Sequence, residues 1–140
     1  MVYLTRVERF NAAHKLSVDS WTTAENLATF GKCANPNWHG HNYYLHVTVK
    51  GKPNPITGFV MDAKKLGDII KEFVIEKLDH RNINLDVPDF PKHLQPTSEN
   101  ITIYIWQQIL PHLVKIGATL HCVKLYETEN IYAEYYGEES

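Results

Sequence analysis

The sequence predicts an α+β domain, a four-stranded antiparallel sheet with two helices on one face. Three observations support this fold class. Segments rich in β-branched and aromatic residues occur near both ends of the chain, and two apolar stripes at helical spacing lie between them. The 140 residues are enough for one domain, 1–140, and the hydrophobic share of 44% is ordinary for a globular protein. The predicted order is β-β-α-α-β-β.

The first part of the chain predicts two strands separated by a polar excursion. Val2 to Ala13 is rich in β-branched and aromatic residues, and Tyr43 to Gly51 alternates apolar with polar residues. Between them, Ser17 to Asn37 contains Thr22-Thr23-Ala24-Glu25, which has the pattern of a capping box. A short helix is therefore favoured inside the excursion.

A turn and a helix follow the second strand. Lys52 to Gly58 contains two prolines and ends in glycine, and Phe59 to Met61 is predicted to return as a strand and form a hairpin. Asp62 is a favourable N-cap, and the helix that it begins is expected to end near Asp79. The buried stripe of this helix consists of Leu66, Ile69, Ile70, Phe73, Val74 and Leu78.

The second half predicts another helix and two more strands. Pro88 and Pro91 keep the intervening segment irregular, and Pro96-Thr97-Ser98-Glu99 has the pattern of a helix start. The stripe of this helix is Ile101, Tyr104, Ile105, Ile109 and Leu113. The strands are predicted at Ala118 to Glu127 and Ile131 to Tyr136. Because exposed sheet edges usually pair with another chain, we expect an oligomer.

Composition limits the partners. A net charge of -2 argues against a nucleic-acid backbone as the main partner. No apolar stretch approaches the roughly 20 residues of a membrane span, so no membrane partner is expected. The two cysteines do not suggest a disulfide framework, and the N-terminus lacks the pattern of a signal peptide. We therefore expect a cytoplasmic location.

Three of the eight histidines have a spacing that suits a metal site. His39 and His41 lie two residues apart, so in an extended strand their side chains point to the same face. His14 joins them if the first two strands are neighbours. Three neutral imidazoles with one open position are typical of catalytic zinc. The alternative is that these are surface or hydrogen-bonded strand histidines, which is how we interpret His46, His93, His112 and His121.

Cys33, in the run Gly31 to Tyr43, has three interpretations. It is a small buried hydrophobe, a fourth zinc ligand that makes the site structural, or a base that stands off the metal. A thiol with a pKa near 8.5 is only a few per cent ionised at pH 7, so a base role needs about 2 kcal/mol of added stabilisation of the thiolate. Cys122 lies in an alternating strand and is interpreted as a hydrophobe.

Five motifs occur in the order FNAAHKL, GKCANPNWHGHNY, LDHRNIN, PTSEN and LYETEN. Together they make the chain resemble, nearly end to end, the 6-pyruvoyl-tetrahydropterin synthase family, which includes a bacterial 6-carboxy-tetrahydropterin synthase branch. The resemblance implies the tunnelling fold and a homo-oligomer, a hexamer of two stacked trimers around a β-barrel. The edges of the sheet would be paired in such an assembly.

The resemblance also implies a site. His14, His39 and His41 match zinc ligands, whose open position takes the side-chain hydroxyls of 7,8-dihydroneopterin triphosphate. Cys33 matches the general base. Asp79 and His80 match a pair that assists the base from a neighbouring subunit, with the carboxylate holding the imidazole in one tautomer. Without the resemblance, these two residues at a helix end would be interpreted as capping and solvated charge.

The remaining matches concern the pterin ring. Glu127 matches an anchor whose carboxylate accepts hydrogen bonds from the ring, and it is a candidate member of the proton relay. Thr97 and Ser98 match polar residues that contact the pterin, although both also suit a helix cap. Glu99 is the weakest match, because a glutamate in the first turn interacts favourably with the helix dipole anyway.

The expected reaction eliminates triphosphate and shifts hydrogen between side chain and ring, so no nicotinamide or flavin is expected. Five residues separate Cys33 from His39, as in pyruvoyl-forming members, whereas compact carboxy-forming members typically have three. The leading hypothesis is a zinc-dependent carbon-oxygen lyase that makes 6-pyruvoyl-tetrahydropterin for a tetrahydrobiopterin-type pathway. One alternative makes 6-carboxy-5,6,7,8-tetrahydropterin and acetaldehyde from the same substrate, for queuosine. The other is a non-catalytic zinc-binding or pterin-binding protein.

Overall fold

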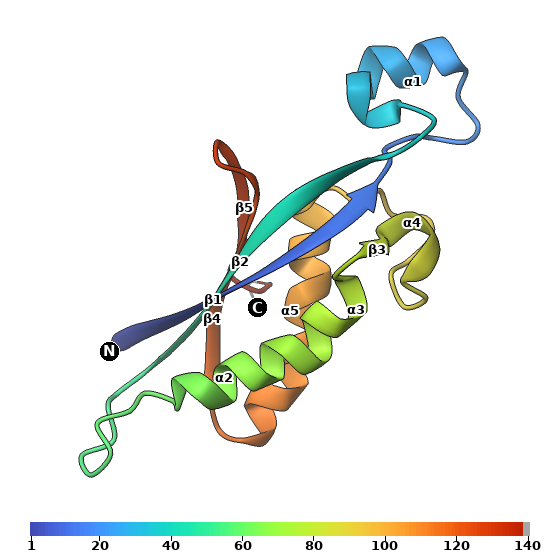
Figure 1. Ribbon diagram of the computed structural model, residues 1–140. Helices are drawn as coiled ribbons and strands as arrows, with labels where there is room; N and C mark the ends of the chain where they lie inside the picture. Colours follow the sequence, from blue (N-terminus) through green and yellow to red (C-terminus); the bar gives the residue numbers. More distant parts are fainter. Residues whose placement is uncertain (139–140) are drawn as a thin grey trace.

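A computed structural model describes residues 1–138 and contains one mixed sheet with helices against it (Figure 1). The strands are β1 (Val2–His14), β2 (His39–Gly51), β3 (Arg81–Asn82), β4 (Thr119–Thr128) and β5 (Ile131–Tyr135). The α-helices are α1 (Thr23–Phe30), α2 (Ala63–Ile70), α3 (Glu76–Leu78), α4 (Ile83–Asp86) and α5 (Ser98–Lys115). A 3-10 turn, η1 (Gly31–Ala34), follows α1, and a π-type turn, η2 (Lys71–Ile75), joins α2 to α3.

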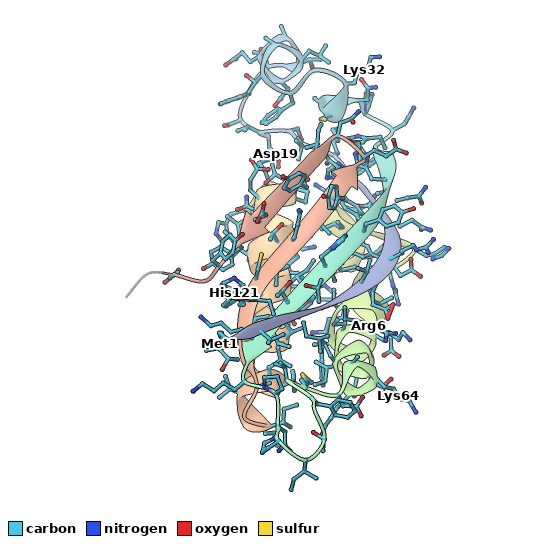
Figure 2. The ribbon with its side chains drawn as sticks, turned by 90° about the vertical axis from the view of Figure 1, so that its left-hand side faces the viewer. Met1, Arg6, Asp19, Lys32, Lys64 and His121 are labelled. Carbon is cyan, nitrogen blue, oxygen red and sulfur yellow. The ribbon has the colours of Figure 1, made fainter. Side chains whose placement is uncertain are left out.

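The sheet has the order β3-β1-β2-β4-β5. All neighbouring strands are antiparallel except the pair of β1 and β3, which is parallel. The helices α2, α3 and α5 cover one face, and Figure 2 shows the opposite face in front of them. The predicted α+β class with helices on one face is confirmed, but the sheet has five strands rather than four.

The additional strand is short and is fixed by contacts distant in sequence. Asp79 Oδ1 accepts a hydrogen bond from the Asn11 backbone N–H at 2.9 Å, and the His80 backbone N–H donates to Asn11 O at 2.7 Å. These bonds align Arg81 and Asn82 with Ala12 and Ala13 of β1. Two residues are too few to give an alternating pattern, so the sequence could not predict β3.

The predicted return strand at Phe59 to Met61 is wrong, because these residues form a bend before α2. The second strand has no free edge there. Gly51 of β2 pairs with Val2 on one side, and Lys50 pairs with Thr119 on the other. The turn at 52–58 leads instead directly to the helix cap.

The two main helices begin where the sequence predicts. The Asp62 carboxylate accepts from the Lys64 backbone N–H at 2.9 Å, and the helical run from α2 through η2 to α3 ends at Leu78, one residue before Asp79. Thr97 caps α5 by accepting from the Asn100 backbone N–H at 3.2 Å. The apolar stripes of both helices pack on the inner face of the sheet and form the core, except that Phe73 is only partly buried and stacks on His112 of α5 outside the core cluster.

The excursion between β1 and β2 forms a separate unit at one end of the sheet (Figure 1). The predicted capping box is confirmed, since Glu25 N–H donates to Thr22 Oγ1 and Thr22 N–H donates to Glu25 Oε1. No residue of α1 is buried. The chain then turns through η1, which carries Cys33, and enters β2 at His39, four residues earlier than predicted. Within residues 1–138, no helix is both long and apolar enough to cross a membrane.

Candidate functional site

Three histidines meet at the end of the sheet beside the excursion. In the register of β1 and β2, His14 lies opposite His39, and Ala12 lies opposite His41. Strand alternation therefore places all three histidines on the helix-facing side. One nitrogen from each lies within 4.8 Å of the others, and the ring centroids are 4.4–5.1 Å apart. The predicted proximity of His14, His39 and His41, here called the triad, is confirmed.

The triad has the donor set of a metal site. His14 is buried, and its Nδ1 lies 2.7 Å from Pro96 O, so Nδ1 carries the proton and Nε2 presents a lone pair. His14 Nε2, both ring nitrogens of His39 and His41 Nε2 have no hydrogen-bond partner among the described residues. Burial lowers the pKa of His14 to about 4 and also lowers that of His39, which favours the neutral imidazoles that bind metal.

We expect the metal-stripped protein to lose stability as the pH falls from about 6.5 to about 4. Folded His14 has a pKa of about 4, chiefly because of burial, whereas an unperturbed histidine titrates near 6.5. In this window the unfolded chain binds a proton that folded His14 does not, so the free energy of unfolding falls by about 3 kcal/mol. Denaturant titrations at several pH values measure this slope.

The control for that measurement is His93→Gln, since His93 is exposed. His14→Gln keeps a donor for Pro96 O and should flatten the pH dependence, while His93→Gln should leave it in place. An equal slope in wild type and His14→Gln would mean that other groups carry the effect.

Glu127 reaches the triad from β4. Its Oε1 lies 3.5 Å from His14 Nε2 and 3.4 Å from His41 Nε2, and 18% of its side chain is exposed. Because His14 Nε2 is a lone-pair acceptor, the carboxylate does not hydrogen-bond to it while His14 is neutral. A cation or a ligand between these acceptors would offset their mutual repulsion.

Cys33 lies at the edge of the same site but outside the cluster of metal-binding atoms. Its carbonyl accepts from the Leu16 N–H at 2.8 Å, which ties η1 to the segment after β1. Burial and the nearby charge of Glu127 raise the pKa of the partly buried thiol. Positive charge at the triad would favour the thiolate and would therefore be needed for a base role.

The N-terminus of α5 also borders the site. Pro96 O holds His14, Thr97 is the N-cap, and Ser98 is buried. Ser98 Oγ has no hydrogen-bond partner within residues 1–138, so it is available to a ligand. Glu99 is exposed in the first turn, where the capping interpretation suffices.

Asp79 and His80 form a fixed pair away from the triad. His80 Nδ1 lies 2.9 Å from Asp79 Oδ2, and the side chain of His80 is 76% exposed. The hydrogen bond from the Asn11 backbone N–H is the largest of the effects that lower the pKa of Asp79, followed by contacts with His80. None of the hydrogen bonds, ion pairs or ring contacts within residues 1–138 joins the pair to a triad histidine.

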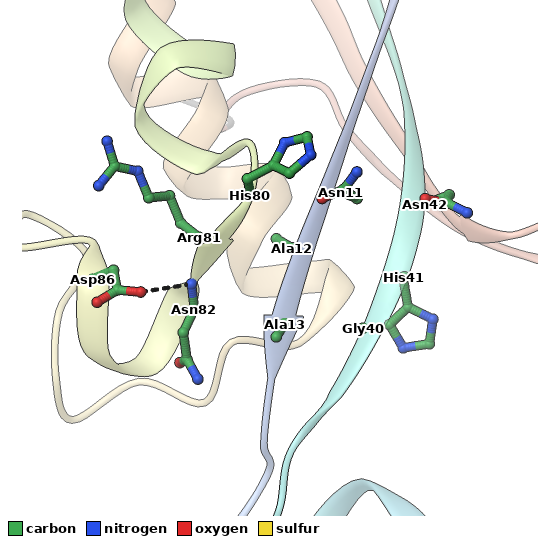
Figure 3. A pocket seen from close by; sticks show the side chains of 10 residues that line it. All are labelled: Asn11, Ala12, Ala13, Gly40, His41, Asn42, His80, Arg81, Asn82 and Asp86. Carbon is green, nitrogen blue, oxygen red and sulfur yellow. Dashed lines mark hydrogen bonds between the residues drawn. The ribbon is translucent and has the colours of Figure 1, made fainter.

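His80 lines a cavity of about 540 Å³, whose other lining residues include Asn11, Asn42 and one triad histidine, His41. In Figure 3, β1 passes between His80 on one side and His41 on the other. Asn11 and Asn42 lie opposite each other on the outward face of β1 and β2, whereas the triad lies on the inward face. The Asp79–His80 pair therefore lies across β1 from the triad, and His41 is the triad histidine that borders the same cavity.

Sequence reasoning missed two residues beside the triad. Tyr43 follows His41 by two positions on the same face of β2, and its hydroxyl is buried without a partner among the described residues. Trp38, just before His39, has a φ of 61°, and the only other non-glycine residue with positive φ in the described chain is His80, at 59°. Such backbone strain clusters at functional sites. Alternation places Tyr43 correctly, but it also fits a core residue, so the sequence alone gave no reason to select it.

Fold and triad together define an α+β protein with a candidate three-histidine metal centre. The model of the family "6-pyruvoyl tetrahydropterin synthase" matches residues 3–138. The chain therefore belongs to the 6-pyruvoyl tetrahydropterin synthase family, and it is an enzyme of the lyase type.

Individual relatives agree with this assignment. The chain is 43% identical to the 6-pyruvoyl tetrahydrobiopterin synthase of Dictyostelium discoideum over 137 residues, covering 98% of this chain and 97% of the relative. It is 44% identical to the human 6-pyruvoyl tetrahydrobiopterin synthase over 132 residues, covering 92% and 87%. The solved 6-pyruvoyl tetrahydropterin synthase of Caenorhabditis elegans superimposes with a TM-score of 0.89 at 37% identity, covering 98% and 96%.

Proposed function

We propose that the protein is a zinc-dependent lyase that converts 7,8-dihydroneopterin triphosphate to 6-pyruvoyl-tetrahydropterin and triphosphate. The observation that carries this proposal is the triad, in which each histidine has a buried nitrogen without a hydrogen-bond partner among the described residues, beside Cys33 and Glu127 in a chain of this family. The names of the relatives favour the pyruvoyl product over the carboxy product. The spacer of five residues between Cys33 and His39 agrees with that choice.

His14, His39 and His41 would hold the zinc ion. Zinc bound there supplies Lewis acidity to the side-chain hydroxyls of the substrate. The bond between His14 Nδ1 and Pro96 O fixes the ring so that Nε2 faces the ion, as the outer partners of metal-bound histidines do. The three neutral ligands leave a position for substrate oxygen, which suits a catalytic rather than a structural site.

The other residues divide into proton transfer and ring binding. Cys33 removes a proton from the substrate side chain. In a neighbouring copy, Asp79 orients His80 of the same chain, and that His80 assists Cys33. Glu127 accepts hydrogen bonds from the pterin ring. Thr97 and the unpartnered hydroxyl of Ser98 lie at the N-terminus of α5, and both would contact the pterin ring.

We also propose the homohexamer that the resemblance implies. Two observations support an oligomer. The outer strand β5 carries exposed Ile131 and Tyr132 at a free edge. The exposed His80 has no hydrogen bond, ion pair or ring contact with the triad among the described residues of its own chain. The cytoplasmic location stays a prediction.

The substrate assay separates the candidate activities. Zinc-loaded protein is expected to release triphosphate from 7,8-dihydroneopterin triphosphate without forming acetaldehyde. Chelation should lower the rate by about 100-fold or more, because the Lewis acid is lost, and added zinc should restore it. Chromatography measures triphosphate and pterin products, and a coupled reductase assay measures acetaldehyde.

Each other outcome identifies an alternative. Acetaldehyde in equal yield with consumed substrate would assign the 6-carboxy-tetrahydropterin reaction instead. Binding of zinc and pterin without turnover would identify a non-catalytic binding protein. Full activity after zinc has been removed would contradict the metal dependence alone.

A further inference from the structure

A buried hydroxyl without a partner lies at the border between core and site, on the same face of the sheet as the Glu127 carboxylate. The Tyr43 side chain is fully buried, and its hydroxyl has no hydrogen-bond partner within residues 1–138. The Glu127 carboxylate, nearby on β4, receives no hydrogen bond from a donor in the same described residues, and its closest contacts are the nitrogens of His14 and His41. A buried hydroxyl without a partner is costly, so its presence requires an explanation.

The end of the ladder between β2 and β4 brings these two groups to the same face of the sheet. Tyr44 pairs with Tyr126 in the antiparallel ladder of β2 and β4. The paired register ends there, and β4 has an irregularity between Tyr126 and Thr128 where it pairs with β5. Glu127 lies on the face that carries Tyr43, because its Oε1 is 3.4 Å from Nε2 of His41, two residues before Tyr43 on β2.

The Tyr43 ring is held in a fixed place. It stacks on Phe10 with centroids 4.8 Å apart and an interplanar angle of 15°, and it meets the His41 ring edge-on at 5.7 Å. A phenylalanine would make the same ring contacts without burying an unpaired hydroxyl. Packing therefore accounts for the aromatic ring but not for the oxygen atom.

We propose that Tyr43 is a positioning residue whose hydroxyl donates a hydrogen bond to the Glu127 carboxylate when a cation occupies the triad. The nitrogens of His14 and His41 then face the cation, and a small rotation of Glu127 toward the Tyr43 hydroxyl leaves its second oxygen free for the pterin ring. A bond from a hydroxyl to a carboxylate is short and charge-assisted. The role in orienting Glu127 toward a pterin rests on the proposed function.

The test removes only the oxygen atom. We expect Tyr43→Phe to fold with unchanged or higher thermal stability and to bind zinc within about 3-fold of wild type, because no ligand is lost. It should raise the KM for 7,8-dihydroneopterin triphosphate and weaken binding of 7,8-dihydroneopterin to the zinc-loaded protein, each by about 10-fold. In a Glu127→Gln background the same substitution should have almost no further effect, since its partner is altered.

Tyr104→Phe is the matched control, because the Tyr104 hydroxyl is bonded to Asp89 at 2.8 Å away from the triad. It should lower stability and leave pterin binding unchanged. Pterin affinity and KM of Tyr43→Phe equal to wild type, or effects that add fully to those of Glu127→Gln, would overturn the proposal. Failure of the wild-type protein to act on the substrate would instead reject the proposed function.

Discussion

Cys33→Ala is expected to retain zinc and lose turnover by about 10²–10⁴-fold, the range that a positioned acid or base contributes. Cys33 lies outside the cluster of metal-binding nitrogens, so its loss should change zinc affinity little. Burial and the charge of Glu127 raise the pKa of its thiol, so the base role depends on the positive charge of the bound ion. Zinc content by elemental analysis and single-turnover rates measure the two effects separately.

The matched control is Cys122→Ala, which removes the other thiol. Cys122 is buried in β4 opposite Thr48 and belongs to the outward-facing set of that strand, away from the triad. Cys122→Ala should change the stability of the protein and leave its zinc content and turnover as in wild type. Loss of zinc in Cys33→Ala would make Cys33 a fourth ligand, and unchanged turnover would make it a small hydrophobe, so both outcomes contradict the base role.

The fold was largely predictable because its periodic patterns are long. The strands at both ends of the chain and the two capped helices have enough residues for alternation or helical spacing to be read directly. The triad was predictable for the same reason, since His39 and His41 share a face and successive strands tend to be neighbours. In each case a local pattern coincides with the tertiary structure.

The errors arise where pairing is set by contacts distant in sequence. Phe59 to Met61 has strand-like residues, but both edges of β2 are already occupied by β1 and β4. The strand β3 exists because Asp79 and His80 bond to the backbone of Asn11. Neither the loss of the strand at Phe59 to Met61 nor the presence of β3 can be recognised from the residues of the segment itself. Tyr43 was missed for another reason. A tyrosine on an apolar face is interpreted as a core residue unless the structure shows that its hydroxyl lacks a hydrogen-bond partner.

Co-expression of Cys33→Ala with His80→Ala is expected to restore about one quarter of wild-type activity, although each variant alone is inactive. The reason is that the exposed Asp79–His80 pair makes no hydrogen bond, ion pair or ring contact with a triad histidine among the described residues. Cys33, in contrast, lies at the edge of the triad site of its own chain. If a site takes its histidine from one chain and its cysteine from another, random assembly completes about a quarter of the sites. Turnover of the purified mixed oligomers measures this.

A second pair of variants tests which residues of one site come from the same chain. Cys33 and Glu127 serve the triad of one chain, so co-expression of Cys33→Ala with Glu127→Gln should restore no activity, since neither parent chain supplies both groups. Light scattering should show that both mixtures assemble to the same size as wild type. If both mixtures regain activity, Cys33 and Glu127 of one site come from different chains. If neither mixture regains activity, His80 and Cys33 of one site come from the same chain. Recovery by the His80 pair alone therefore requires a site completed by a second copy, for which the exposed His80 and the free sheet edges are suited.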